Sequence, residues 1–337
     1  MDHAVYFHIP FCTHRCAYCD FNTYAGQEHS IPEYANALCN EIEFIGQEQG
    51  PGSILLSTIY FGGGTPSLLS PKHYVSILQR IRNDFILKDG AEITMEANPG
   101  TVTFENLHLF RELGINRLSL GVQSANTEEL RMLERTHDFP DAISAVSSAR
   151  KSGFDNINLD LIYGLPGQTL NTWQTTVERI LDLRPDHISA YGLTLEHGTP
   201  FGRWSARGLL PTPDPDLAAE MYELASEVFE TAGYSQYEIS NWSKPNRQCN
   251  HNLQYWRGLP YLGLGAGAHG YANGFRYSNV LRIKTYIERL NAIQSSHNGL
   301  RDSNFHFPLS PAMVNKHRQT RQDNITEFMI TCLRLTE

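Results

Sequence analysis

The chain has few basic residues and no long hydrophobic run. Lysine and arginine together number 27, against 36 aspartate and glutamate residues, so the formal net charge of the 337 residues is −9. This balance argues against a broad nucleic-acid or anionic-membrane surface, because such a surface needs a basic face. No apolar segment approaches the roughly 18 residues of a membrane-spanning helix. We therefore expect no nucleic-acid partner and no integral membrane segment.

Targeting features and a disulfide framework are also missing. The first residues, MDHAVYFHIPFC, contain neither a basic region nor a long apolar region, so no secretory signal is visible. Six cysteines are too few for a disulfide scaffold in a chain of this length, and three of them lie within eight residues. Such crowding is typical of metal binding in a reducing compartment. We therefore expect a cytoplasmic protein.

The chain does contain enough apolar material for a large core, since hydrophobic residues make up 41% of it. Up to about residue 195, short β-rich runs alternate with helix-like stretches. The expected strands are residues 5–9, 58–61, 92–96, 117–120, 157–163 and 187–193. The expected helices are residues 32–45, 71–85, 104–113, 127–135, 140–151 and 172–183.

Six β/α units in succession predict a parallel sheet, which either curls into a barrel or is doubly wound. The positions of the polar residues favour the barrel. Glu96, Gln123 and Asp160 lie at or near the ends of three strands, and a glycine turn and the cysteines follow two others. A barrel gathers its strand ends around one mouth, so these segments would meet in one site. We expect an α/β fold with an incomplete parallel (β/α)6 TIM-like barrel.

The composition changes after a helix expected at residues 215–232. Residues 234–280 are rich in Tyr, Trp, Asn and Gly and show no βα alternation, whereas residues 280–337 look mostly helical. We therefore divide the chain into a barrel domain, residues 1–233, and a smaller α-rich C-terminal domain, residues 234–337.

Cys12, Cys16 and Cys19 form a C-x3-C-x2-C motif directly after the first expected strand. Thiolates so close in sequence must share a small target, because a loop of eight residues cannot send them apart. Zinc normally takes four protein ligands, and His8 or His14 could supply the fourth. A [4Fe–4S] cluster held by three cysteines instead leaves one iron open to an outside ligand. Free structural thiols are the remaining alternative.

The cysteine segment HIPFCTHRCAYCDF resembles the cluster loop of radical S-adenosylmethionine (SAM) enzymes. The resemblance implies that Cys12, Cys16 and Cys19 hold a [4Fe–4S] cluster whose open iron is chelated by the amine and carboxylate of SAM. It also implies electron transfer from the reduced cluster to SAM, which yields methionine and a 5′-deoxyadenosyl radical. A protein that donates electrons to the cluster would then be a partner.

Further segments resemble the SAM-contacting stretches of the coproporphyrinogen dehydrogenase (HemN-like) branch. They are GGGTP, MEANPG, LSLGVQS, ERTH and INLDLIYGLPGQT. The glycines of the first segment let the backbone approach a ligand and present N–H groups to an anion. The resemblance assigns SAM contacts to Tyr6, Gly63, Gly64, Thr65, Glu96, Gln123, Arg135 and Asp160. Arg135 would meet the SAM carboxylate, although a solvated helix-end cation is its alternative role. Asp160 would take the ribose hydroxyls, although it could also be a structural polar group.

Two departures weaken the dehydrogenase interpretation. Phe21 stands where the dehydrogenase has a fourth cysteine, and only eleven residues precede Cys12 where the dehydrogenase has a long arm. Downstream, HNLQYW resembles the H-N-x-x-Y-W motif of HemW-type haem chaperones, in which the histidine is tied to haem binding. The resemblance therefore assigns haem contacts to His251, Tyr255 and Trp256. An imidazole can ligate haem iron and aromatic rings can cover a porphyrin, although a loop histidine among core aromatics is the alternative.

The resemblance covers almost the whole chain and implies a HemW-type haem chaperone. Such a protein binds a [4Fe–4S] cluster, SAM and haem, and passes haem to an acceptor protein. We expect haem to dock between the aromatic loop around His251 and the barrel. The alternatives are an oxygen-independent coproporphyrinogen III dehydrogenase of porphyrin biosynthesis and a zinc-stabilised binding module. Members of this branch usually continue beyond the helix expected at residues 325–337, so we expect the C-terminal domain to be cut short at Glu337.

Overall fold

The computed structural model of the protein describes residues 2–50, 52–295 and 305–336. Its centre is a run of parallel strands, each hydrogen-bonded to the next. In spatial order they are β1 (His3–Ile9), β4 (Leu55–Gly63), β5 (Ile86–Ala97), β6 (Arg117–Gln123), β7 (Ile157–Tyr163) and β8 (His187–Gly192). The expected six-unit parallel barrel, which falls short of closure, is thereby confirmed.

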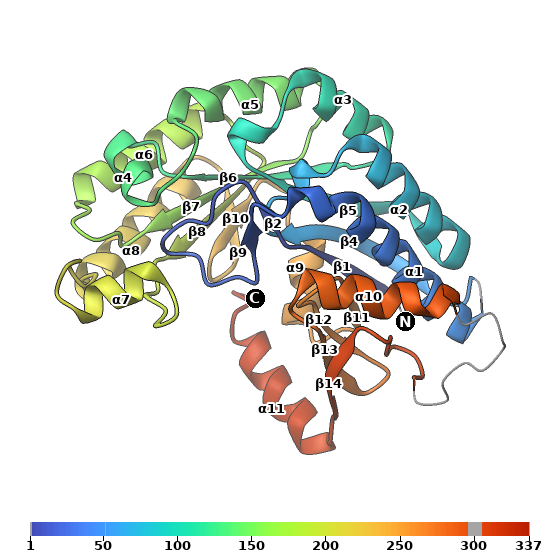
Figure 1. Ribbon diagram of the computed structural model, residues 1–337. Helices are drawn as coiled ribbons and strands as arrows, with labels where there is room; N and C mark the ends of the chain where they lie inside the picture. The colour runs from blue at the N-terminus through green and yellow to red at the C-terminus, as the bar shows by residue number, and fades with distance from the viewer. Residues whose placement is uncertain (1, 51, 296–304, 337) are drawn as a thin grey trace.

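Helices connect these strands and lie along the outer side of the curved sheet (Figure 1). The connecting helices are α1 (Ile31–Gln49), α2 (Pro71–Asp84), α3 (Phe104–Glu112), α4 (Thr127–Met132), α5 (Phe139–Lys151) and α6 (Leu170–Asp182), and α7 (Pro200–Ala206) and α8 (Pro215–Thr231) follow β8. Local sequence explains where several of them begin. Thr103, Asp138 and Thr169 each accept a backbone hydrogen bond at the start of α3, α5 and α6 and complete a capping box.

The two faces of the parallel sheet differ in character. Side chains such as Phe7, Phe61 and Leu159 point outward and join the main hydrophobic cluster beneath the helices. Because alternate strand residues face opposite sides, the intervening residues point into the barrel. Many of these are polar, and Thr58 and Asn158 are each 2% exposed. The interior of the barrel is therefore a buried polar region.

The C-terminal residues extend both edges of the same sheet. On one side β10 (Asn241–Ser243) pairs with β8, and β9 (Ser235–Glu238) pairs with β10. On the other side β11 (Tyr261–Leu264) lies parallel to β1. Three further strands follow it in antiparallel order: β12 (His269–Ala272), β13 (Phe275–Asn279) and β14 (Met313–Arg318).

In the described residues of this C-terminal part the helices are α9 (Asn250–Trp256), α10 (Ile283–Ser295) and α11 (Arg321–Cys332). The expected helical content is therefore present, but the expectation that residues 280–337 are mostly helical missed β14. Part of that expectation, residues 296–304, lies outside the described residues. The division into domains at residue 233 stays a prediction.

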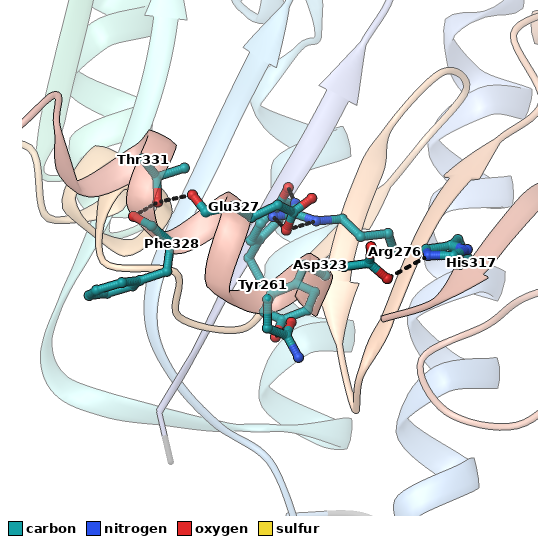
Figure 2. Close-up of polar contacts among 9 residues, drawn as sticks. Tyr261, Arg276, His317, Asp323, Glu327, Phe328 and Thr331 are labelled. Atoms are coloured by element: carbon teal, nitrogen blue, oxygen red, sulfur yellow. Dashed lines mark hydrogen bonds and ion pairs between the residues drawn. The ribbon is translucent and has the colours of Figure 1, made fainter. Parts of the chain in front are cut away.

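Helix α11 is attached to the edge of the sheet largely through polar contacts (Figure 2). Arg276 on β13 donates to the Glu327 carboxylate at 2.6 and 2.8 Å and to the Tyr261 hydroxyl at 2.8 Å. His317 and Asp323 form a second contact at 3.1 Å. No helix within the described ranges is long and apolar enough to cross a membrane.

Candidate functional site: the barrel mouth

The cysteine motif lies in a loop that a small sheet closes at its base. Strands β2 (Phe11–Cys12) and β3 (Tyr24–Ala25) pair in parallel and bracket the rest of the loop. The thiols of Cys12, Cys16 and Cys19 are partly exposed and free of disulfides. Burial raises the pKa of the Cys12 and Cys19 thiols, which favours their neutral form until a positively charged metal is bound.

A cavity of about 480 Å³ lies at the carboxyl ends of the parallel strands. The cysteine loop forms one of its walls, and the segments that follow β4, β5, β6 and β8 contribute to the others. Ten of the residues selected from the sequence line it together: Cys12, Cys16, Cys19, Gly63, Gly64, Thr65, Glu96, Gln123, Arg135 and Asp160. The expected convergence of separate strand ends on one site is thus present in the structure.

The glycine turn is held tightly against the first strand. Gly63 has φ of 108°, and a Cβ atom placed there would come within 2.5 Å of the His8 ring. Gly64 N–H donates to the Ile9 carbonyl at 2.9 Å, and Thr65 N–H donates to the Phe11 carbonyl at 2.7 Å. Because Gly63 N–H is also bonded, to Glu96, the expectation that this turn presents free N–H groups to an anion is wrong.

Two carboxyl groups face the cavity from neighbouring parts of the barrel. Glu96 accepts hydrogen bonds from the Tyr60 hydroxyl at 2.8 Å and from Gly63 N–H at 3.0 Å. Burial and then the charge of Asp160 raise the pKa of Glu96 to about 7. Asp160 accepts from Ser119 at 2.9 Å, and burial raises its pKa as well. Burial of two like charges favours a positively charged ligand between them.

Arg135 supplies a cation to the same cavity. Its guanidinium donates to the Gly121 carbonyl at 2.7 Å, to the Asn98 side chain, to the Tyr18 hydroxyl at 3.4 Å and to the Cys16 sulfur at 3.7 Å. A solvated helix-end cation would make no such set of contacts, so that alternative is wrong. Arg135 is instead fixed beside the cysteine loop, with its Nε atom buried and without a described partner.

Gln123 occupies an irregular position at the end of β6. Its φ of 69° is in the left-handed region, which a residue other than glycine adopts at a cost of about 1–3 kcal/mol. The β6–β7 register shifts between Gly121 and Gln123. This bulge places Gln123 in the cavity wall, and backbone strain of this kind is common at ligand sites.

The four remaining predicted residues lie outside the cavity lining. Tyr6 contacts the His8 ring through its hydroxyl at 3.0 Å and stacks near Tyr60. His251, Tyr255 and Trp256 belong to α9, and His251 contacts Thr58 in the amino-terminal half of β4.

His251 lies in the first turn of a helix and is 1% exposed, so the expected aromatic loop is not what the structure shows. Its Nδ1 atom is 2.8 Å from the Thr58 hydroxyl, and its Nε2 atom is 2.8 Å from the Tyr255 hydroxyl. Burial lowers the pKa of His251 to about 3, so the ring is neutral. With both nitrogens engaged inside the barrel, this arrangement does not fit an axial ligand to haem iron.

Comparison with known proteins identifies the family. The radical SAM superfamily matches residues 6–180. The chain is 42% identical over 288 residues to the heme chaperone HemW of Bacillus subtilis, covering 85% of this chain and 75% of that protein. It is 41% identical over 290 residues to the heme chaperone HemW of Mycobacterium tuberculosis H37Rv, covering 85% and 74%. The chain belongs to the HemW family of the radical SAM superfamily.

A solved structure supports the fold of this HemW-family chain. Coproporphyrinogen III oxidase (HemN) from Escherichia coli, described as a radical SAM enzyme, superposes with a TM-score of 0.82. The match covers 99% of this chain and 76% of HemN at 24% sequence identity, so it shows a shared fold. Membership of the radical SAM superfamily implies a [4Fe–4S] cluster and SAM as cofactors.

Several cavity residues were not selected from the sequence. Tyr60, Asn98, Tyr191 and Glu196 all line the mouth. Asn98 lies within the MEANPG segment, and Tyr191 is near the end of the sixth parallel strand. Asn98 could have been found by asking which residues follow each strand, and Tyr191 by asking which residues lie at the carboxyl end of one. Tyr60 gave no such signal, because it precedes the glycine turn inside a strand.

Proposed function

We propose that this HemW-family chain is a haem chaperone. In this proposal it carries a [4Fe–4S] cluster and SAM at the barrel mouth and passes haem to an acceptor protein. The observation that carries the proposal is 40–42% identity, over at least 85% of the chain, to bacterial proteins named heme chaperone HemW. The acceptor and a protein that supplies electrons to the cluster are its partners, and the cytoplasm is its proposed location.

Cys12, Cys16 and Cys19 are the proposed cluster ligands. They share one wall of the cavity, and the cluster would supply one-electron chemistry beside the SAM pocket. Thr65 donates to the Cys12 sulfur at 3.7 Å, and Arg135 reaches the Cys16 sulfur at the same distance. Donors directed at the sulfurs stabilise thiolate charge.

The remaining mouth residues match the charges of SAM, which has a carboxylate, an ammonium and a sulfonium. We propose that Arg135 binds the carboxylate of SAM and that the ammonium and sulfonium groups lie near Glu96. Asp160 is assigned to the ribose hydroxyls and Gln123 to a neutral hydrogen bond. Gly63, Gly64 and Thr65 shape the wall and, because their N–H groups are occupied, contribute through shape and carbonyl groups.

Haem ligation by His251 is not part of this proposal, because neither ring nitrogen is available in the structure. Tyr6 is likewise placed beneath the pocket, where it supports Tyr60 and His8. The dehydrogenase alternative lacks its fourth cysteine, since Phe21 stands there with a side chain that is 62% exposed beside the cavity.

The proposal is tested on the anaerobically reconstituted protein with two substrates in parallel. Haem is titrated and its binding is followed in the Soret region, and coproporphyrinogen III is incubated with SAM and a chemical reductant. The chaperone proposal predicts saturable haem binding, transfer of that haem to an apo-haemoprotein, and no porphyrinogen decarboxylation. Conversion of coproporphyrinogen III with SAM consumption and without stable haem binding would establish the dehydrogenase instead.

A further inference from the structure

Helix α9 closes the end of the barrel opposite the mouth, and we call this end the barrel floor. The floor is defined by α9 and its N-cap residue Cys249, together with Thr58 and Glu92, which contact α9 from β4 and β5. The Glu92 carboxylate accepts hydrogen bonds from the N–H groups of Asn250 and His251 at 3.0 and 3.1 Å. It thereby caps the start of α9, whose N-cap residue, Cys249, makes no side-chain capping bond. The orientation of α9 is therefore set by the barrel strands.

His251 is a buried residue of α9, with 1% of its surface exposed. Its two ring nitrogens join β4, through Thr58, to the next turn of α9, through Tyr255. The imidazole also lies against aromatic rings, with its centroid 5.0 Å from that of Tyr60 and 6.5 Å from that of Tyr6. The ring is thus fixed by hydrogen bonds at both nitrogens and presents its face to Tyr60.

Tyr60 connects this floor to the mouth. Its ring packs over His251 at an interplanar angle of 30°, and its hydroxyl donates to the Glu96 carboxylate at 2.8 Å. The other oxygen of Glu96 accepts from Gly63 N–H in the glycine turn. Tyr60 and Glu96 both line the cavity, whereas His251 does not. A continuous set of contacts therefore runs from His251 through Tyr60 to Glu96.

We propose that His251 is a positioning residue for the SAM pocket and not a haem ligand. It supports the Tyr60 ring, and Tyr60 holds the Glu96 carboxylate where SAM binds. Removing the imidazole leaves a space beneath Tyr60 and leaves the Thr58 and Tyr255 hydroxyls without their partner. Tyr60 is then free to move, and its hydrogen bond to Glu96 weakens. The inference rests on the proposed SAM site at Glu96 but not on the proposed transfer of haem.

The first part of the test measures SAM affinity by equilibrium dialysis on the reconstituted protein. His251→Ala and Tyr60→Phe should each weaken SAM binding about five- to ten-fold, the scale of a hydrogen bond to a charged group that is partly lost. The double variant should be no weaker than the poorer single variant, because both changes break the same path. His251→Gln should restore most of the affinity, since an amide can bond to the same hydroxyls. Asn252→Ala is the matched control on α9 and should leave the affinity unchanged.

The second part measures haem binding to the same variants in the Soret region. The glutamine side chain has no nitrogen lone pair for iron, so His251→Gln separates hydrogen bonding from iron ligation. The proposal predicts that both His251 variants bind haem with the wild-type spectrum. Loss of that spectrum in His251→Gln, with SAM affinity unchanged, would overturn the proposal and make His251 a haem ligand. Should His251→Ala fail to fold, His251→Gln and Tyr60→Phe decide the matter.

Glu96→Gln separates failure of this inference from failure of the proposed function. If Glu96→Gln leaves SAM affinity unchanged, the SAM site itself is misplaced. If Glu96→Gln weakens SAM binding while His251→Ala and Tyr60→Phe do not, the SAM site stands and the positioning role of His251 is wrong. If the wild-type protein binds no haem, the chaperone proposal fails, and the SAM measurements still decide the role of His251.

Discussion

The mouth and the floor of the barrel are built from the same strands and are both rich in polar side chains, yet they differ in what those side chains face. At the floor, the Glu92 carboxylate accepts hydrogen bonds from the N–H groups of Asn250 and His251, and the His251 ring nitrogens lie 2.8 Å from the Thr58 and Tyr255 hydroxyls. At the mouth, the Glu96 and Asp160 carboxyl groups border a cavity of about 480 Å³. The floor groups mostly satisfy one another, and the mouth groups are arranged around space for a ligand.

This difference shows that a buried polar residue is not by itself a sign of a binding site. Buried polar groups in folded proteins are normally hydrogen-bonded, and the floor follows that rule except at the Trp256 indole N–H, which has no described partner. What distinguishes the mouth is its place at the carboxyl ends of parallel strands, where barrel proteins bind their ligands. The floor contributes indirectly, by holding side chains such as Tyr60 that reach the mouth. Mutations at the two ends should therefore have different consequences.

The largest difference is expected in cluster content, between variants of the three cysteines at the mouth and a variant of Cys249 at the floor. Replacing Cys12, Cys16 or Cys19 with Ala should abolish the cluster, because three thiolates are needed to hold it. Cys249→Ala, at the floor, should leave about four iron and four sulfide per chain, the content of one [4Fe–4S] cluster. Chemical analysis of iron and sulfide after anaerobic reconstitution measures both. An equal requirement for Cys249 would show that the mouth alone does not hold the cluster.

The next largest effect, smaller than loss of the cluster, is expected on SAM affinity when Arg135 is replaced. Arg135→Ala should weaken SAM binding by about 1–3 kcal/mol, because it removes charge-assisted hydrogen bonds at the mouth. Arg131→Ala is the matched control, since Arg131 lies on α4 and pairs with Glu128 at an exposed site. Isothermal titration with SAM distinguishes the two variants. Equal affinities would remove Arg135 from the SAM site.

The smallest effect concerns pH. The pKa of Glu96 is raised to about 7 by burial and by Asp160, so the carboxyl group is neutral below that pH and charged above it. A neutral Glu96 cannot attract the positive charges of SAM, so the affinity should fall as the pH drops through about 7. The expected change between pH 8 and pH 6 is up to about ten-fold. Glu96→Gln should flatten this dependence, and an unaltered slope in that variant would assign the titration to another group.

Much of the barrel could be predicted because hydrophobic periodicity and helix start signals are local. Strand β7 has the predicted bounds, and α2 differs from its prediction by one residue. The edge strands could not be found this way. Strand β11 is specified by its pairing with β1, more than 250 residues earlier, and β14 has mostly exposed residues with no alternating pattern. Such strands form because an existing sheet edge offers hydrogen-bonding partners.

The mouth was predictable because its residues belong to motifs at strand ends, whereas the floor was not. Glu92 and Glu96 are four residues apart on one strand, so both face the barrel interior and periodicity cannot separate them. The two residues differ in how close they lie to the carboxyl end of β5. Glu92, farther from that end, caps a helix, and Glu96, near it, is a candidate ligand contact. His251 shows the same limit, because a residue type that can bind iron is here used to join α9 to β4.

The most direct measurement compares Glu96→Gln with Glu92→Gln, a matched pair on β5, for SAM affinity and for unfolding by denaturant. Glu96→Gln should lower SAM affinity more than Glu92→Gln, with little change in stability, because Glu96 is partly neutral already. Glu92→Gln should lose about 1–3 kcal/mol of unfolding free energy, because the charge that caps α9 is removed. The reverse order, with SAM affinity more sensitive to Glu92 than to Glu96, would contradict the assignment of the ligand site to the mouth.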